Sequence, residues 1–290
     1  MTVGREQERV AAVSVIIPTI GRAHELERTL AALAEAMPRA AEIVVVDQSG
    51  GDEVAALVRR FEAAGARRVG SQGRGVALAA NEGLKDARHE AILFTDDDCT
   101  VAADWIGVGL ELMTKWPACI FTGRVLPSGN PENVPTTAVS VVARDYTGDP
   151  YCSVLVRSNM VGSRSRLLEI GGFDERFETS AEDDDLCYRW LKAGGCLRYE
   201  PKLVVWHREW RAPEDVKERY FRYGEEQGTF YVKHLRAGDP GVLRFLARDL
   251  RSGLRALAAA AARRGDRPLD PRLSVARGVL RGLRTTGREA

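Results

Sequence analysis

Ala91-Ile92-Leu93-Phe94-Thr95-Asp96-Asp97-Asp98-Cys99 is the stretch of sequence that decides the fold. Its first four residues form an apolar run without polar alternation, which is typical of a strand buried on both faces of a sheet. Three carboxylates follow directly, where the strand ends. Two interpretations account for these mutually repelling charges: a solvated acidic turn, or a site for a hard divalent ion such as Mg²⁺ or Mn²⁺.

Two strand-and-helix units precede this stretch, and each consists of a β-branched run, a turn and an amphipathic helix. The predicted strands are residues 13–18 and 42–47, and the predicted helices are residues 24–37 and 54–61. This alternation predicts a doubly wound α/β sheet with parallel strands. Ligands of such sheets bind beyond the carboxyl ends of the strands, where Thr19, Asp47 and residues 96–98 fall. We therefore expect these side chains to face one crevice.

A glycine-rich loop, residues 71–76, comes before a predicted helix that contains Asn81. Glycines ahead of a helix allow backbone N–H groups to approach a phosphate, and the Arg74 guanidinium can add a charge-assisted contact. The same loop also fits a turn with a solvated arginine. By itself it does not decide between the two.

The second half of the chain holds another acidic run, Glu182-Asp183-Asp184-Asp185, at the start of a predicted helix. The helix dipole favours acids in a first turn, so capping explains one or two of these residues but not four. Further on, the apolar strand 203–207 ends in His207, which is either a structural residue or a ligand. The other histidines, His24, His89 and His234, match no motif and are expected at the surface.

These motifs together resemble those of family 2 glycosyltransferases, the inverting, metal-dependent enzymes of the GT-A fold. The matching segments of the nucleotide-binding half are residues 14–19, 46–49, the glycine-rich loop with 81–83, and 95–98, in the family's order and spacing. The run Gly171-Gly172-Phe173-Asp174-Glu175, followed by Glu182, Asp183 and Arg189, looks like the acceptor-side signature of that family. The resemblance extends along most of the chain up to His207.

The resemblance implies a role for each matched residue. Asp47 would meet the nucleotide base, Asp96 would lie near the ribose, and Asp98 and His207 would ligate Mn²⁺ or Mg²⁺. Asp183 would be the catalytic base that takes the proton of the acceptor hydroxyl, and Glu182 would help to position the acceptor. The other residues expected on the nucleotide-sugar side are Pro18, Thr19, Arg22, Arg74, Asn81 and Asp97, the last without an assigned role.

The sequence departs from the family pattern at one position. Members usually carry an arginine directly before the asparagine of the glycine-rich segment, whereas this chain has Ala80. A phosphate or base contact is therefore absent or moved. Arg74 lies in the same loop and is the expected substitute.

Composition and charge suggest how the chain is organised. It has 290 residues, of which 44% are hydrophobic and 29% charged, as is ordinary for globular proteins. The formal net charge is +1, but residues 241–290 hold twelve arginines against four acids, a local charge of about +8. We expect an extended or disordered segment at 1–10, a GT-A domain at 11–237 and a basic amphipathic helical tail at 238–290. Within the domain, residues 11–123 would bind the nucleotide sugar and residues 124–237 would form the acceptor and catalytic half.

The tail admits two interpretations. One is a helix that lies in an anionic membrane interface, with its leucines in the membrane and its arginines beside lipid headgroups. The other is a helix packed on the catalytic domain with its arginines in water. Five cysteines without a CxxC pair suggest neither a disulfide framework nor a zinc ribbon. Together with the absence of an export signal or a membrane-spanning run, this predicts a cytoplasmic protein, peripheral to the inner face of the membrane in the first interpretation.

The predicted function is transfer of a sugar from a UDP-, GDP- or dTDP-sugar to a hydroxyl of a carbohydrate, lipid-linked or small-molecule acceptor. One alternative is a sugar nucleotidyltransferase, although the chain has no glycine-rich basic loop after its first strand. Another is a catalytically silent nucleotide-sugar-binding scaffold at the membrane. No nucleic-acid partner is expected, because no recognition motif accompanies the arginines of the tail. The sequence does not specify the sugar, the acceptor or the oligomeric state.

Overall fold

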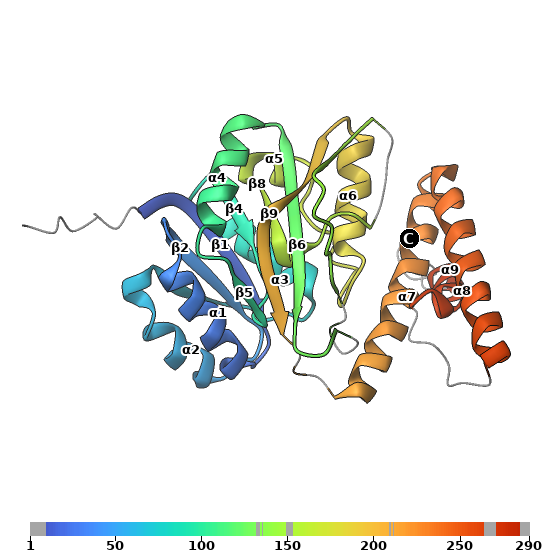
Figure 1. Ribbon diagram of the computed structural model, residues 1–290, viewed down its shortest axis with the longest axis horizontal. Helices are drawn as coiled ribbons and strands as arrows, with labels where there is room; N and C mark the ends of the chain where they lie inside the picture. Colours follow the sequence, from blue (N-terminus) through green and yellow to red (C-terminus); the bar gives the residue numbers. More distant parts are fainter. Residues whose placement is uncertain are drawn as a thin grey trace, which may run out of the picture. The chain divides into compact units, whose positions relative to one another are not determined.

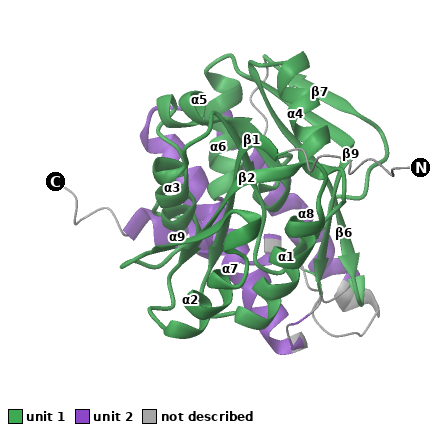
Figure 2. Cartoon of the chain, turned by 90° about the vertical axis from the view of Figure 1, so that its left-hand side faces the viewer, with its two compact units in different colours: residues 1–178, 182–209 green, residues 179–181, 210–290 purple. Residues whose placement is uncertain are grey.

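The computed structural model describes residues 10–131, 134, 136–148, 153–208, 210, 212–263 and 271–284. They form two compact units, residues 1–178 with 182–209 and residues 179–181 with 210–290 (Figure 2). The segment predicted to be extended or disordered, residues 1–10, lies outside the described residues except for Val10, which begins the first strand.

A mixed sheet forms the centre of the first unit (Figure 1). Its strands are β1 Val10–Thr19, β2 Arg39–Asp47, β3 Ala66–Gly70, β4 Ala91–Phe94, β5 Cys99–Val101, β6 Cys119–Ser128, β7 Arg144–Thr147, β8 Met160–Ser163 and β9 Cys196–Arg208. The order is β3-β2-β1-β4-β8-β6-β9-β5, with β7 also paired to β9. The first four strands are parallel, as predicted. Strand β8 is antiparallel to both β4 and β6, which makes the sheet mixed.

Helices cover both faces of this sheet. They are α1 Ala23–Glu35, α2 Asp52–Arg59, α3 Val76–Asp86, α4 Trp105–Lys115, α5 Arg164–Glu169 and α6 Glu182–Lys192. Successive residues of a strand point to opposite faces. Val15 and Ile17 accordingly pack in a core with α1, α2 and α4, whereas Ile16 packs in a second core with α3, α5 and α6. The strands are therefore apolar on both sides, which is why they read as continuous hydrophobic runs.

The sheet brings the expected polar residues to one edge. Thr19 and Asp47 end β1 and β2 and lie opposite each other in the parallel register. Strand β4 pairs with β1 and is followed by the three aspartates. The predicted convergence of three strand ends is thereby confirmed.

The structure contains a disulfide that the sequence analysis did not expect. Cys119 opens β6 and Cys196 opens β9, and the two are opposite in register with their Cα atoms 4.6 Å apart. The two cysteines are 77 positions apart in the sequence, so their spacing gave no indication that they pair. Cys99 and Cys187 are buried and form no disulfide within the described residues.

Asn159 secures the centre of the sheet at a register shift between β6 and β9. Its Nδ2 donates to the carbonyl oxygens of Arg124 at 2.9 Å and Leu203 at 3.1 Å, and its Oδ1 accepts from Trp105 Nε1 at 2.8 Å. The asparagine ends a short 3₁₀ helix, η3, at Arg157–Asn159. These three hydrogen bonds therefore fix the position of η3 and of the arginine that begins it.

The second unit is helical. It contains α7 Pro213–Arg236, η4 Pro240–Val242, α8 Leu243–Arg263, η5 Pro271–Leu273 and α9 Val275–Arg284. Helix α7 packs closely on α9, where buried Glu225 pairs with Arg277 at 2.8 Å and Arg281 at 3.4 Å. The second compact unit thus includes α7 as well as the helices of the predicted tail, and the predicted domain boundary after residue 237 stays a prediction. His234 of α7 is buried beside the Phe230 ring, so the expectation that it lies at the surface was wrong.

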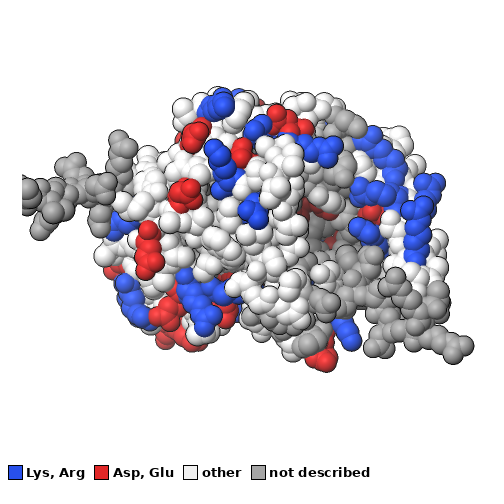
Figure 3. Space-filling model, in the orientation of Figure 1, with Lys and Arg blue, Asp and Glu red and all other residues white. Residues whose placement is uncertain are grey.

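Helix α8 exposes some of its leucines. Phe245, Asp249 and Gly253 are on its buried face, and Tyr231 of α7 donates a hydrogen bond to Asp249. Leu254 remains 67% exposed and Leu257 43% exposed. Figure 3 shows lysine and arginine side chains gathered over the helices of this unit on the face in view. Among the described residues, no helix combines the length and apolar character needed to cross a bilayer.

Substitution of Asn159 by alanine tests the role assigned to it in the sheet. Asn159→Ala removes three hydrogen bonds and leaves buried polar partners unsatisfied, so the free energy of unfolding should fall by roughly 2–4 kcal/mol. Urea unfolding measures this loss. Thr114→Ala, which removes an exposed hydrogen bond on α4, is the control and should stay within about 0.5 kcal/mol of the original protein. Equal stability of the two variants would contradict the role of Asn159.

Candidate functional site

The candidate site lies where β1, β2 and β4 end, beside β5, the end of β9, η3 and the first turn of α6. It gathers two acidic runs that are far apart in the sequence, at 96–98 and 182–185. The partners of each carboxylate show how the protein accommodates so much negative charge.

Asp97 is fully buried and ties the loop after β1 to the acidic run. It accepts hydrogen bonds from Thr19 Oγ1 at 2.6 Å and from Arg22 Nε at 2.9 Å, and Arg22 Nη2 also pairs with it. Thr29 of α1 donates to the Asp97 carbonyl at 2.9 Å. The role of Asp97 that the sequence left unassigned is therefore to hold this loop. Thr19 and Arg22, both predicted to bind the nucleotide sugar, are the residues it holds.

Asp47 is likewise fully buried at the end of β2. One of its oxygens accepts from Arg68 Nε of β3 at 2.8 Å, and the other accepts from the backbone N–H of Ser49 at 2.8 Å. Sequence reasoning missed Arg68, although an arginine on a neighbouring parallel strand is a natural partner for such a carboxylate. Pro18 is buried in β1 opposite Val46. The contact between Asp47 and a nucleotide base stays a prediction.

Asn81 holds the acceptor-side turn through its side-chain amide. Its Oδ1 accepts from the Phe173 N–H at 2.9 Å, and its Nδ2 donates to the Phe173 carbonyl at 2.8 Å and to Glu175 at 2.9 Å. Gly172 has a φ of +64°, and a Cβ there would lie 2.4 Å from Asn81 Oδ1. The asparagine therefore requires the glycine. Arg74, by contrast, is exposed.

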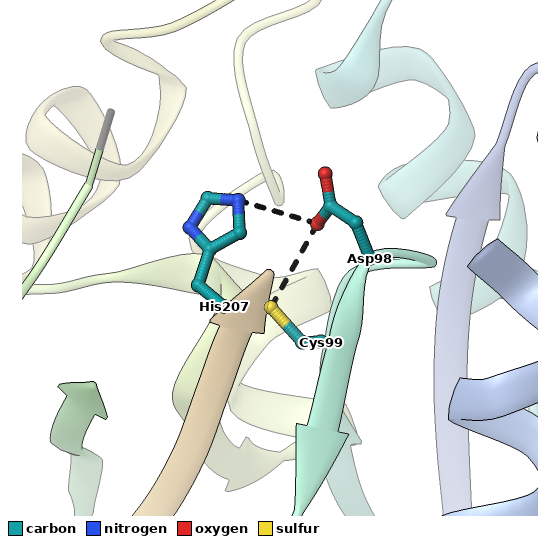
Figure 4. Close-up of side chains that lie close together, drawn as sticks. All are labelled: Asp98, Cys99 and His207. Carbon is teal, nitrogen blue, oxygen red and sulfur yellow. Dashed lines mark hydrogen bonds and ion pairs between the residues drawn. The ribbon is translucent and has the colours of Figure 1, made fainter. Parts of the chain in front are cut away.

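Asp98, Cys99 and His207 form a buried group whose ligand atoms all lie within 4.8 Å of one another (Figure 4). His207 Nε2 is 3.4 Å and Cys99 Sγ is 3.8 Å from Asp98 Oδ1. The antiparallel pairing of β5 and β9 places Cys99 opposite His207, and His207 Nδ1 lies 3.3 Å from the Thr136 carbonyl. Sequence reasoning selected Asp98 and His207 but missed Cys99, because the pairing of these two strands was not predicted.

The chemistry of this group fits a divalent ion. A carboxylate oxygen and an imidazole nitrogen are ligands that Mn²⁺ accepts, and Mg²⁺ prefers the oxygen. Burial, followed by the negative charge of Asp98 and Asp96, raises the pKa of the Cys99 thiol well above its usual range. Sulfur is also a softer ligand than Mn²⁺ and Mg²⁺ prefer, so Asp98 and His207 are the expected ligands among the three residues.

Arg157 connects the two acidic runs. Its Nη2 lies 2.6 Å from Asp96 Oδ1, and its Nε donates to Glu182 Oε1 at 3.1 Å. The side chain is 6% exposed, and its neighbouring carboxylates raise the pKa of the guanidinium further above its usual value. Sequence reasoning missed this residue, since η3 follows an irregular segment that gave no pattern.

The acids at the start of α6 differ in what neutralises them. Asp185 pairs with Arg189 at 2.7 Å, Asp184 accepts from the Ser153 N–H at 2.5 Å, and Glu182 has Arg157. Among the described residues, Asp183 accepts backbone hydrogen bonds alone, from Arg157 N at 3.4 Å and Asp184 N at 2.9 Å. No arginine or lysine side chain within the described ranges forms an ion pair with it.

The environment of Asp183 favours its protonated form. Burial, followed by the charges of Glu182 and Asp184, raises the pKa of Asp183 well above its usual range, with Arg157 opposing the shift. A carboxylate that is buried without a cation of its own binds a proton readily. This is the property required of a group that removes a proton from a substrate.

The chain is similar in sequence to a known protein family and to curated proteins. The model described as glycosyl transferase family 2 matches residues 14–167. Pre-mycofactocin glycosyltransferase from Mycobacterium tuberculosis is 28% identical over 235 residues, which are 77% of this chain and 48% of that protein. The chain thus spans about half the length of the curated relatives it matches.

Solved structures show the same architecture. The mannosyltransferase PcManGT from Pyrobaculum calidifontis, in complex with GDP-Man and Mn²⁺, has a TM-score of 0.63 with 18% identity, and the match covers 96% of this chain and 88% of that chain. S. aureus TarS 1–349 in complex with UDP-GlcNAc has a TM-score of 0.59 with 18% identity, and the match covers 75% of this chain and 66% of that chain. At these identities the likeness concerns the fold, and it confirms the predicted GT-A-like architecture.

Proposed function

Because the chain belongs to glycosyl transferase family 2, we propose that it transfers a sugar from a nucleotide-diphosphate sugar to an acceptor hydroxyl with inversion at the anomeric carbon. The observation that carries this proposal is the contrast between Asp183 and its neighbours. Glu182 and Asp185 have arginine partners, whereas the half-buried Asp183 beside them has none within the described residues. Such a carboxylate suits a general base.

In the proposed mechanism, Asp183 accepts the proton of the acceptor hydroxyl as its oxygen attacks the anomeric carbon. Glu182 is fixed by Arg157 and keeps the start of α6 in place beside the acceptor. The bond to the nucleotide diphosphate breaks on the face opposite the attack, so a single displacement inverts the configuration. Retention of configuration in the product would overturn this mechanism.

Asp98 and His207 would hold a divalent ion, Mn²⁺ or Mg²⁺. When bound, that ion supplies positive charge that stabilises the leaving diphosphate. The loop after β1, held by Asp97, and Asp47 at the end of β2 would face the nucleotide. The complexes of PcManGT with GDP-Man and of TarS with UDP-GlcNAc support testing both GDP- and UDP-sugars.

A panel of nucleotide sugars tests the proposal directly. UDP-, GDP- and dTDP-sugars with MnCl₂ are compared by thermal shift, since a bound ligand stabilises the folded protein in proportion to the logarithm of its concentration over Kd. The stabilising sugar nucleotide is then incubated with the protein to follow slow release of the nucleoside diphosphate. Formation of a nucleotide sugar from a nucleoside triphosphate would instead indicate a nucleotidyltransferase, and binding without turnover would indicate a silent scaffold.

Replacement of Asp183 provides the first functional prediction. Asp183→Asn should retain nucleotide-sugar binding but lower the transfer rate by roughly 10²- to 10⁴-fold, because it removes the general base. Asp145→Asn, which changes an exposed carboxylate paired with Arg198 on β9, is the matched control and should transfer normally. A normal rate in Asp183→Asn would exclude this residue as the base.

The transfer rate should also depend on pH. A base acts only when deprotonated, so the rate should fall as pH decreases through the pKa of Asp183. An ordinary aspartate has a pKa of about 3.9. Because burial raises the pKa of Asp183, the rate should begin to fall at a pH well above this value. A pH profile of kcat measures this limb. A rate that is constant down to pH 5 would contradict the assignment.

Metal binding tests the group at the end of β9. Asp98→Asn and His207→Ala should each weaken Mn²⁺ binding by at least about tenfold, whereas Cys99→Ser should change it little, because sulfur is a softer ligand than Mn²⁺ prefers. Titration calorimetry with MnCl₂, in the presence of a nucleoside diphosphate, measures the affinity. Equal losses in all three variants would point to the thiol as a ligand.

We also propose that α8 contacts an anionic membrane surface. Leu254 and Leu257 are exposed on this helix, and Arg251 and Arg255 are exposed beside them. An outward row of leucines flanked by arginines supports insertion of the apolar side chains between acidic headgroups. The alternative, in which the leucines pack against protein, does not account for their exposure within the described residues.

Vesicle binding tests this proposal. Arg251→Glu with Arg255→Glu should weaken binding to phosphatidylglycerol vesicles by at least about tenfold, since each basic residue near an anionic surface contributes about 1 kcal/mol. Arg59→Glu with Arg60→Glu makes the same change in net charge on exposed residues of the first unit and should have little effect. Equal loss in both pairs, or no binding by the original protein, would overturn the contact.

A further inference from the structure

Arg157 has hydrogen-bonding capacity that its protein neighbours do not use. Its Nη2 and Nε are paired with Asp96 and Glu182, but its Nη1 is buried and has no hydrogen-bond partner among the described residues. Glu182 Oε2 is buried and unpartnered in the same way. Arg157 therefore has unused N–H donors, and the glutamate that pairs with it has an unused acceptor oxygen.

Two unsatisfied groups of opposite kind on one ion pair indicate a ligand. Leaving a buried polar atom without a partner costs about 1–3 kcal/mol, and more for charged groups, so native proteins rarely do so except at binding sites. The hydroxyl groups of a sugar match this pair, because a hydroxyl oxygen can accept from Nη1 and a hydroxyl hydrogen can be donated to Oε2. A phosphate, which only accepts, would repel Glu182.

The position of the pair selects which hydroxyl it binds. Asp96 lies beside Asp98, where the leaving diphosphate would sit, and Glu182 lies beside Asp183, the proposed base. In an in-line displacement the sugar being transferred must lie between the leaving group and the base. Arg157 spans this interval, since it contacts both acidic runs.

We propose that Arg157, together with Glu182, binds a hydroxyl group of the sugar of the nucleotide-sugar substrate and so determines which sugar is accepted. This inference rests on the proposed function. Arg157 also acts as a positioning residue, because its backbone N–H contacts Asp183 and its side chain fixes Glu182. It is the buried arginine beside the first acidic run, whereas Arg74, which the sequence suggested for the nucleotide side, is exposed.

The test separates recognition of the sugar from recognition of the nucleotide. Titration calorimetry on the full chain with MnCl₂ gives Kd for UDP and UDP-GlcNAc, and for GDP and GDP-mannose, and the pair that the original protein binds is used further. In Arg157→Lys, Kd for the nucleoside diphosphate should change little, whereas Kd for the nucleotide sugar should rise about tenfold or more, as expected for loss of a hydrogen bond from a charged group. The ratio of the two dissociation constants is the measured quantity.

Two further variants keep the result interpretable. Arg157→Gln with Glu182→Gln removes one charge of each sign, so Glu182 is not left as an unpaired buried charge, and it should raise the same ratio. Arg198→Gln, which alters an arginine paired with Asp145 away from the site, should leave the ratio unchanged. Thermal melting verifies that each variant is folded.

An unchanged ratio in Arg157→Lys and in the double variant would overturn the role of Arg157 while leaving the proposed function intact. Equal weakening of nucleoside diphosphate and nucleotide sugar, accompanied by a lower melting temperature, would assign Arg157 a purely structural role and also overturn it. If the original protein binds none of the nucleotides or nucleotide sugars, the proposed function fails and this inference with it.

Discussion

Two acidic runs, residues 96–98 and 182–185, lie close together, and the rest of this site depends on how their charge is compensated. Carboxylates withdrawn from water cost several kcal/mol each unless a cation compensates them. The first unit meets this requirement with four arginines: Arg22 from the loop after β1, Arg68 from β3, Arg157 from η3 and, within α6 itself, Arg189. The ion pairs of the first three also fix the geometry of the segments they join.

Two carboxylates of the site have neighbours of another kind. Asp183 accepts backbone hydrogen bonds and forms no ion pair within the described residues, and Asp98 lies beside His207. A fully compensated site would be stable but chemically inert, since a carboxylate locked to an arginine neither takes a proton nor binds a metal readily. The arginines therefore pair with the carboxylates that hold the segments of the site together, and not with Asp183, which we propose as the base.

Sequence patterns predicted the elements whose information is local. The strands at β1, β2 and β4 and the first two helices follow from hydrophobic periodicity, and the run 96–98 follows a strand that had to end there. Features that depend on pairing between distant segments were not predicted. The disulfide between Cys119 and Cys196 and the approach of Cys99 to His207 both need the register of β9, which periodicity does not supply. The same holds for the packing of α7 with α9.

Arg157 illustrates why the remainder of the site escaped sequence reasoning. An isolated arginine in an irregular segment reads as a solvated residue, because most arginines are. Its burial depends on Asn159, two positions later in the chain. The Asn159 amide bridges β6 and β9 at their register shift and so holds η3 in place. The position of Arg157 thus depends on Asn159, which makes hydrogen bonds but has no part in the proposed reaction. Because that neighbour is required by the register shift, the geometry of the sheet itself places a cation between the two acidic runs.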